Sequence, residues 1–172
     1  MATPRIAPCL WFDTQAEEAA RYYTGIFRNS KIRAINRYPD AGTEIHHKPA
    51  GSVMTVDFEL DGLRFTALNG GPDFKFNEAV SLQVLCKDQE EIDYYWEKLG
   101  AGGDPKAQQC GWLKDRYGVS WQVGPADMAE MFVDETSPQT KRAMEAMLKM
   151  KKIDMAEIQR AYDGKSLQTA TV

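Results

Sequence analysis

The stretch CGWLKDRYGVSWQVG, residues 110–124, decides the fold. It predicts a hairpin in which one strand ends near Lys114, a turn begins at Asp115 and ends at Gly118, and a second strand covers residues 119–123. Asp suits the first turn position because its carboxylate bonds to the local backbone, and Gly accepts the geometry that the fourth position needs. A β-hairpin therefore closes this half of the chain.

The second strand of this hairpin alternates in polarity. Val119, Trp121 and Val123 point to one side, while Ser120 and Gln122 point to the other. The apolar side suits packing against a helix. The opposite side carries the amide of Gln122, which can line a cavity.

The same order of elements occurs twice along the chain. Residues 80–86 predict a strand, and Asp88 with Glu91 forms a capping box that starts a helix. Earlier in the chain, residues 6–12 predict a strand, and Thr14 with Glu17 forms a similar box. The pattern of strand, capped helix and further strands indicates an internal duplication, although little residue identity survives between the halves.

The first half also contains a hairpin and a long loop. Residues 53–60 and 63–69 are predicted as strands joined by the two-residue turn Asp61-Gly62, after a strand at residues 31–38. Residues 39–52 read as a mobile loop. That loop holds His46 and His47, the only histidines, and adjacent side chains in an extended chain point apart, so they make a poor chelating pair.

Residues 126–163 are predicted to form C-terminal helices. Ser137-Pro138 is a cap followed by proline at the first helical position, and Asp154 with Glu157 caps another helix. Residues 164–172 are expected to be a disordered tail.

Composition limits the class of protein. The chain has 172 residues, 43% of them hydrophobic, and a formal charge of −4, which argues against a nucleic-acid partner. No apolar run approaches the roughly 20 residues of a membrane span, and no signal peptide is recognised, so we expect a cytoplasmic protein. Cys9, Cys86 and Cys110 lie in apolar strand contexts and are expected to be reduced, buried and inert.

Many spaced residues resemble the PhnB-like branch of the vicinal oxygen chelate superfamily, which is often labelled 3-demethylubiquinone-9 3-methyltransferase. They are Leu10-Trp11-Phe12-Asp13, Ala16-Glu17-Glu18-Ala19, Tyr23, Phe27, Ser30-Lys31-Ile32, Leu68-Asn69-Gly70-Gly71-Pro72, Phe74-Lys75-Phe76-Asn77, Gln89-Glu90-Glu91-Ile92-Asp93, Cys110-Gly111-Trp112 and Trp121-Gln122. The segment Met147-Leu148-Lys149-Met150-Lys151-Lys152 of the tail resembles the same branch.

The resemblance implies an α+β fold in which two βαβββ modules form a cupped mixed sheet, followed by a C-terminal helical extension. The paired modules would occupy residues 1–125, with modules at about 5–70 and 79–125. A homodimer is expected as well, because the edges of such sheets and the Met-rich stripes of the tail offer surface to a second copy.

The resemblance also implies where a metal would be held in metal-dependent members. Those ligand positions fall on Pro8 or Ile6, on Ala67 or Asn69, on Ser81 with Gln83 nearby, and on Gln122. Such residues lack the imidazoles and carboxylates that a catalytic divalent metal needs. We therefore expect no metal and no cofactor.

The function expected from this resemblance is binding of a small organic molecule in a concave cup, with turnover left open. The candidate ligand-binding residues are Phe12, Asn69, Ser81, Gln83, Ser120 and Gln122. One alternative is a protein that sequesters a drug-like molecule without catalysis. Another is the methyltransferase of the family label. Asp57 or Glu59 could act as a general base, but solvent-side carboxylates at a sheet surface are the simpler interpretation.

Overall fold

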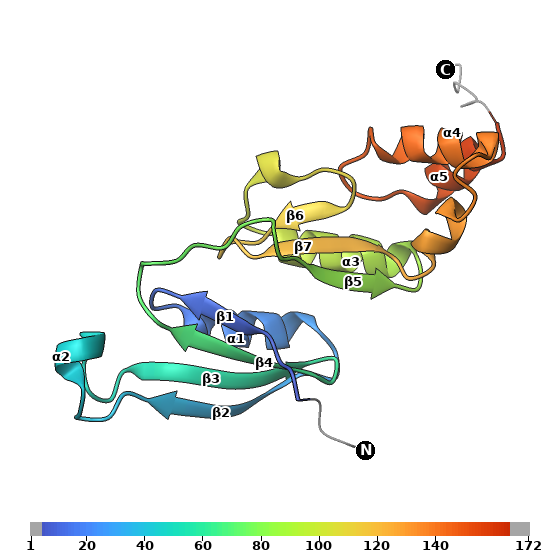
Figure 1. Ribbon diagram of the computed structural model, residues 1–172. Coiled ribbons are helices and arrows are strands. Elements are labelled where there is room, and N and C mark those ends of the chain that lie inside the picture. Colours follow the sequence, from blue (N-terminus) through green and yellow to red (C-terminus); the bar gives the residue numbers. More distant parts are fainter. Residues whose placement is uncertain (1–4, 166–172) are drawn as a thin grey trace. The chain divides into compact units, whose positions relative to one another are not determined.

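The computed structural model describes residues 5–165 (Figure 1). The prediction of a disordered tail at residues 164–172 falls almost wholly outside this range. The chain divides into two compact units, Met1–Phe76 and Asn77–Val172, and each is described by itself. No helix in the described range is long and apolar enough to cross a membrane.

The first unit is a sheet with one long helix packed on it. The strand order is β1-β4-β3-β2, in which β1 and β4 are parallel and the other neighbouring pairs are antiparallel. Its elements are β1 (Cys9–Phe12), α1 (Ala16–Ile26), β2 (Lys31–Arg37), α2 (Thr43–His46), β3 (Val53–Leu60) and β4 (Leu63–Asn69).

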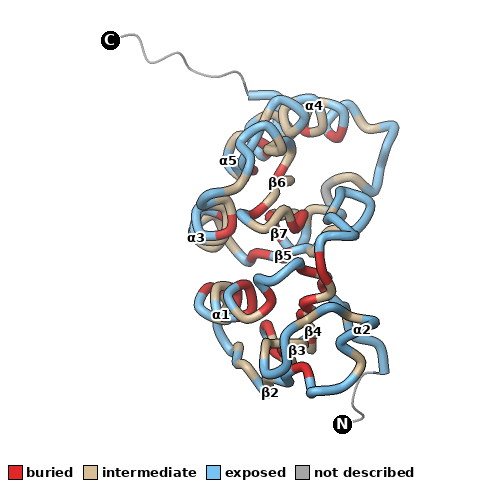
Figure 2. The backbone as a smooth tube through the Cα atoms, turned by 90° about the vertical axis from the view of Figure 1, so that its left-hand side faces the viewer, coloured by how far each residue is buried: buried red, intermediate tan, exposed pale blue. Residues whose placement is uncertain are grey.

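The core of this unit lies between α1 and the sheet, where the buried residues of both are found (Figure 2). Tyr23 of α1 stacks on Phe58 of β3 with ring centroids 6.3 Å apart, and Phe58 stacks on its cross-strand partner Phe65 at 5.3 Å. Complete burial of a ring of this size contributes about 2 kcal/mol to the free energy of folding. The predicted turn is confirmed, since Asp61 and Gly62 both have positive φ angles, as that hairpin type requires.

Two local predictions for the first unit are wrong. Thr14 and Glu17 do not form a capping box: the cap position is Gln15, without a side-chain cap, and the first helical N–H is bound by Asn69 from β4. A tertiary contact thus replaces the local one. The segment 39–52, predicted as a loop throughout, contains the short helix α2.

The second unit is a shorter version of the first. Its sheet has the order β5-β7-β6, with β5 and β7 parallel and β6 and β7 antiparallel. The segment η1 follows the helix where the first unit has a strand. The elements are β5 (Leu82–Cys86), α3 (Gln89–Gly100), η1 (Pro105–Ala107), β6 (Trp112–Lys114) and β7 (Ser120–Pro125).

The predicted capping and turn chemistry is confirmed in this unit. The Asp88 carboxylate accepts the N–H of Glu91 at 2.9 Å and starts α3. Asp115 is 3% exposed, and its Oδ1 accepts the N–H groups of Tyr117 and Val119 at 2.8 and 3.0 Å. Its Oδ2 accepts the indole N–H of Trp121 at 2.8 Å. One buried carboxylate therefore fixes the turn and the strand that follows it.

The C-terminal extension, which is part of the second unit, packs on the α3 and β6 side of that unit. It comprises η2 (Met128–Phe132), α4 (Pro138–Met147) and α5 (Met155–Tyr162). Ser137 and Asp154 cap α4 and α5, as predicted. The segment between these helices runs past β6, where the N–H groups of Cys110 and Gly111 donate to the carbonyls of Met150 and Lys151 at 2.9 and 2.8 Å.

The fold class is thus confirmed: the protein is α+β, with two related modules of strands around a helix and a C-terminal helical extension.

Candidate ligand-binding site

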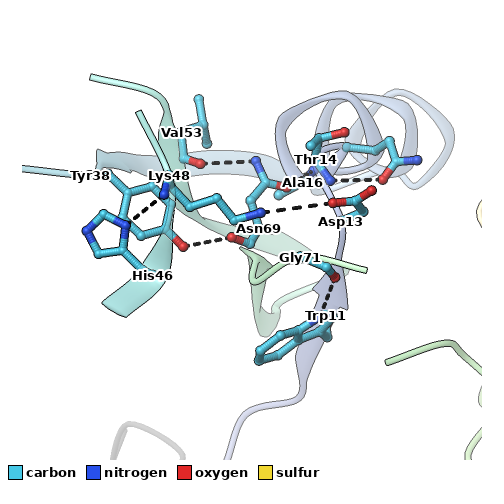
Figure 3. A network of polar contacts seen from close by, with 11 residues as sticks. Trp11, Asp13, Thr14, Ala16, Tyr38, His46, Lys48, Val53, Asn69 and Gly71 are labelled. Atoms are coloured by element: carbon cyan, nitrogen blue, oxygen red, sulfur yellow. Dashed lines mark hydrogen bonds and ion pairs between the residues drawn. The ribbon is translucent and has the colours of Figure 1, made fainter. Parts of the chain in front are cut away.

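Asn69 lies buried at the end of β4, and its side chain joins α1 to β3 (Figure 3). Its Oδ1 accepts the N–H of Ala16 at 2.8 Å, and its Nδ2 donates to the carbonyl of Val53 at 3.1 Å. The Ala16 N–H is one of the helix-start donors that no helical carbonyl can reach, so Asn69 satisfies it from outside. The backbone carbonyl of Asn69 accepts the hydroxyl of Tyr38 at 2.7 Å. Asn69 therefore has a structural role in this network.

Phe12 lies beside Asn69. The two are register partners in the parallel pair β1–β4, and Phe12 is 4% exposed. Its ring meets Phe76 edge to face at 5.2 Å. Because side chains alternate along a strand, both residues lie on the helix-covered face of the first sheet, and the open face carries their neighbours instead. Phe12 and Asn69 belong to the first unit, whereas the predicted glutamines Gln83 and Gln122 belong to the second.

His46 and His47 do not form a chelating pair. The ring of His46 contacts Tyr38, with centroids 4.6 Å apart, and its Nδ1 accepts the N–H of Lys48 at 3.0 Å. His47 ends α2 in a left-handed backbone conformation. His46 thus supports its own loop, as Figure 3 shows.

The glutamines lie together on the second sheet. Gln83 of β5 and Gln122 of β7 are register partners, and the Nε2 of Gln83 lies 3.4 Å from the Oε1 of Gln122. Gln122 donates in turn to the hydroxyl of Ser81 at 2.7 Å. Three of the predicted residues therefore form one hydrogen-bonded row on the sheet face that α3 leaves uncovered.

Ser120 extends this row into the protein. It precedes Gln122 by two positions, so it lies on the same face of β7, but it is 1% exposed. Its hydroxyl is buried without a hydrogen-bond partner within the described residues. Its neighbour across the ladder is Lys114, whose ammonium pairs with Glu78. Ser120 thus closes the polar end of the face and carries an unmet hydrogen-bonding group.

A cavity of about 480 Å³ opens beside the glutamines. This volume falls within the range of small-molecule sites. None of its lining residues is Asp, Glu, Lys or Arg. They are Gln83, Val84, Leu85, Cys110, Gly111, Trp112, Gln122, Val123, Gly124, Pro125, Ala126, Met128, Ala129, Phe132, Met147 and Ile153.

The sequence did not identify the wall that the extension contributes to this cavity. Met128, Phe132 and Met147 belong to η2 and α4. Their only sequence signal is the narrow Met-rich stripe of the tail, which equally fits packing on any irregular surface. Leu85, 65% exposed, was also missed, although its alternation with Gln83 places it on the same face.

The thiols are less uniform than expected. Cys86 is buried, and this burial, together with Glu91 and Asp88, raises the pKa of its thiol to about 12. Cys9 is exposed on β1, so the expectation that it is buried is wrong. Partial burial and the nearby Asp57 charge still raise its pKa. Neither group is an activated thiolate, because activation requires a lowered pKa.

The carboxylates considered as general bases are engaged. Asp57 accepts the hydroxyl of Thr66 at 2.9 Å. Glu59 pairs with Arg33 and lies 3.5 Å from the Lys31 ammonium. Desolvation opposes ionisation of Glu59, but the two cations prevail and hold its pKa below the ordinary value. A lowered pKa makes Glu59 a weaker base.

The residues at the positions that the family resemblance assigns to metal ligands do not fit a divalent metal. Ser81, Gln83 and Gln122 offer only neutral oxygens, and Ala67 is buried. Over residues 5–165, no three His, Cys, Asp or Glu side chains are grouped to hold a metal ion. Pro8 directly precedes β1, and Cys9 is the exposed β1 residue opposite Thr66.

Element analysis of protein purified without a histidine tag tests this assignment. The expected result is far less than one equivalent of any divalent metal, because neutral amide and hydroxyl oxygens bind such ions weakly. Stoichiometric zinc, nickel or iron that disappears on Gln122→Ala would contradict it.

The comparisons agree with the fold. Residues 4–124 match the sequence profile of a family described as 3-demethylubiquinone-9 3-methyltransferase. Among solved structures, a PhnB protein from Bacillus cereus, for which that methyltransferase activity has been suggested, is 36% identical with a TM-score of 0.60. That match covers 72% of this chain and 100% of the other. A search of curated proteins found no match.

Two further structures are less similar in sequence, and only the first of them supports the fold. Protein PA1353 from Pseudomonas aeruginosa is 19% identical over 69% of this chain and 95% of its own, with a TM-score of 0.53. The fosfomycin resistance protein FosX from Mesorhizobium loti is 15% identical over 76% of this chain and 97% of its own, with a TM-score of 0.49.

Parallel first and last strands in each sheet, with a helix after the first strand, define a protein of the vicinal oxygen chelate fold. Within that superfamily, the chain belongs to the PhnB-like family described as 3-demethylubiquinone-9 3-methyltransferase.

Proposed function

We propose that this protein binds a small, neutral organic molecule on the open face of its second sheet without using a divalent metal. The observation that carries the proposal is the row Ser81–Gln122–Gln83 beside a cavity of about 480 Å³ whose lining has no charged residue. A few polar groups on an otherwise apolar surface are typical of a small-ligand site. A charged ligand would lose its hydration there without gaining a counter-charge.

The two amides offer both kinds of hydrogen bond. In the row, Gln83 donates to Gln122 and Gln122 donates to Ser81, so neither bond uses the carbonyl oxygen of the exposed Gln83, which can accept a hydrogen bond from a ligand. Each terminal amide nitrogen has a second N–H as well. A hydroxyl, a carbonyl or an amide of a ligand can therefore be recognised, with Trp112 at the edge as an aromatic surface.

Calorimetric titration with naphthol and with naphthalene tests this proposal, since the two probes differ by one hydroxyl. We expect saturable binding at one site and tighter binding of naphthol. The variant Gln122→Leu should weaken naphthol binding about tenfold and leave naphthalene nearly unchanged, because it removes a hydrogen-bonding group but keeps an apolar side chain of similar size.

Gln159→Leu is the matched control. Gln159 is exposed on α5, bonds to Asp163 at 2.9 Å and does not line the cavity. It should leave both affinities unchanged. Naphthol binding that is insensitive to Gln122→Leu would refute the assigned site.

The methyltransferase description of the family is not supported by a methyl-donor site here. Such sites on α/β folds use a Gly-rich turn that leads directly into a helix. In this chain the segment from Gly70 to Ser81 forms neither helix nor strand. The carbonyl of Gly71 instead accepts the indole N–H of Trp11 at 2.8 Å (Figure 3). Sequestration without chemistry is the alternative to turnover, because the side chains of Ser81, Gln83 and Gln122 in the row are all neutral.

We also propose that the protein is a cytoplasmic homodimer. Free thiols at Cys9, Cys86 and Cys110 suit a reducing compartment. The strands β1, β2, β5 and β6 lie at the edges of their sheets, and Leu148 of the extension is exposed. Light scattering of the full chain should give twice the chain mass. A monomer at micromolar concentration would contradict the proposal.

A further inference from the structure

The open face of the second sheet changes from polar to apolar along its length. Ser120 and Lys114 pair at one end, Gln83, Gln122 and Trp112 form the next row, and Leu85 pairs with Gly124 beyond them. Gly124 has no side chain, and the Cε of Met128 lies 3.5 Å from the position that a Cβ would take there. The cavity therefore extends from the amides toward the C-terminal extension.

The extension supplies the wall of this cavity that lies away from the amides. Met128, Ala129 and Phe132 of η2, Met147 of α4 and Ile153 line it, and all of them are apolar. Every one lies beyond residue 124, where the match to the family ends. The amides thus belong to the family's module, whereas the apolar wall belongs to the extension.

The segment of the wall that carries Ile153 is held by contacts with α3. Ile153 is 1% exposed, and its carbonyl accepts the Nε2 of Gln89 on α3 at 3.0 Å. The Oε1 of Gln89 accepts the N–H of Met155 at 2.9 Å, so one glutamine clamps both sides of the segment. Lys152 forms an ion pair with Asp93 on the same helix. These contacts fix the segment that carries Ile153 against α3, and Ile153 forms part of the wall of the cavity.

We infer that the C-terminal extension determines ligand specificity: the ligand is amphipathic, with one neutral hydrogen-bonding group at Gln83 and Gln122 and an apolar body that reaches Met128, Phe132 and Met147. This inference rests on the proposed function, because it assumes that the amide row is the polar end of the site. It adds the length and the apolar character of the remainder of the ligand.

Two neutral probes and two variants, in each of which one alanine is replaced by phenylalanine, test the inference. Naphthol reaches only the amide row, whereas N-phenyl-naphthylamine carries an additional ring that would lie against the extension. Ala129→Phe fills the far wall, and Ala156→Phe on α5 is its control, because both alanines are exposed and only Ala129 lines the cavity. Affinities for the full-length protein come from calorimetry for naphthol and from fluorescence enhancement for the longer probe.

We expect Ala129→Phe to weaken the longer probe about tenfold, the affinity equivalent of one displaced ring, and to change naphthol binding less than about twofold. Ala156→Phe should change neither affinity. Anilinonaphthalene sulfonate, the charged analogue of the longer probe, should bind about tenfold more weakly than the neutral compound, because the lining offers no cation.

Three results would overturn the inference. The longer probe could be indifferent to Ala129→Phe, both probes could weaken equally, or the sulfonate could bind as tightly as the neutral compound. In each case a naphthol affinity that still depends on Gln122 would leave the proposed function intact. Naphthol binding that does not depend on Gln122 would instead remove the proposed function itself.

Discussion

Replacing Asp115 by alanine is expected to destabilise the second unit by about 4 kcal/mol, because three donors, two of them buried, lose a charged acceptor. Those donors are the N–H groups of Tyr117 and Val119 and the indole N–H of Trp121. The carboxylate is 3% exposed, so water cannot readily replace it in the folded hairpin. Urea unfolding of the full chain, followed by circular dichroism, measures the change in the free energy of unfolding.

Two further variants make this prediction specific. Asp115→Asn keeps the size of the side chain and one carbonyl oxygen but turns an amide N–H toward one of the donors, so its loss should be smaller, roughly 2 kcal/mol. Asp127→Ala is the control, because Asp127 is exposed and caps η2 without a side-chain hydrogen bond; it should change stability by less than about 0.5 kcal/mol. A cost below about 1 kcal/mol for Asp115→Ala would show that the turn does not depend on the carboxylate.

This hairpin could be predicted because its determinants are local. Asp115, Gly118 and the alternation around Trp121 act within a few residues of one another, as do Asp61-Gly62 and the cap at Asp88. The start of α1 could not be predicted in the same way. Its cap comes from Asn69, which is distant in sequence, and nothing near Thr14 indicates that a β4 residue satisfies the helix.

The site follows the same division. Strand alternation correctly placed Gln83 and Gln122 on one face, and the parallel pairing of β5 with β7 then made them neighbours. Phe12 and Asn69 were assigned to the open face, but their register with the helix-covered core places them on the other side. An error of one residue in strand register reverses the face of every side chain, and a family resemblance without alignment cannot fix register that closely.

The cavity wall lay beyond sequence reasoning for a different reason. The helices of the extension have narrow apolar stripes that specify no particular partner. Their position depends on Gln89 and on the backbone of Cys110 and Gly111, which bind the connecting segment by main-chain carbonyls. Main-chain contacts of this kind leave little trace in side-chain patterns.

Gly103→Ala is the other substitution with a large expected effect. A Cβ at this position would lie 1.9 Å from the carbonyl oxygen of Lys114 and 3.0 Å from its carbonyl carbon. Both atoms belong to the backbone of β6, so no side-chain rotation can relieve the overlap. The turn after α3 or the strand that carries the hairpin would have to move. We expect a loss of about 3 kcal/mol or more in the free energy of unfolding.

The matched replacement Gly25→Ala should have the opposite sign. Gly25 lies near the end of α1, and a Cβ there would meet no atom within 4 Å. Alanine restricts the unfolded chain and favours the helix, so stability should rise by roughly 0.5 kcal/mol. Thermal unfolding of the two variants beside the parent chain decides the matter. Equal effects of the two substitutions would contradict the close approach of the α3–η1 connection to Lys114, on which the position of β6 beside Gln122 depends.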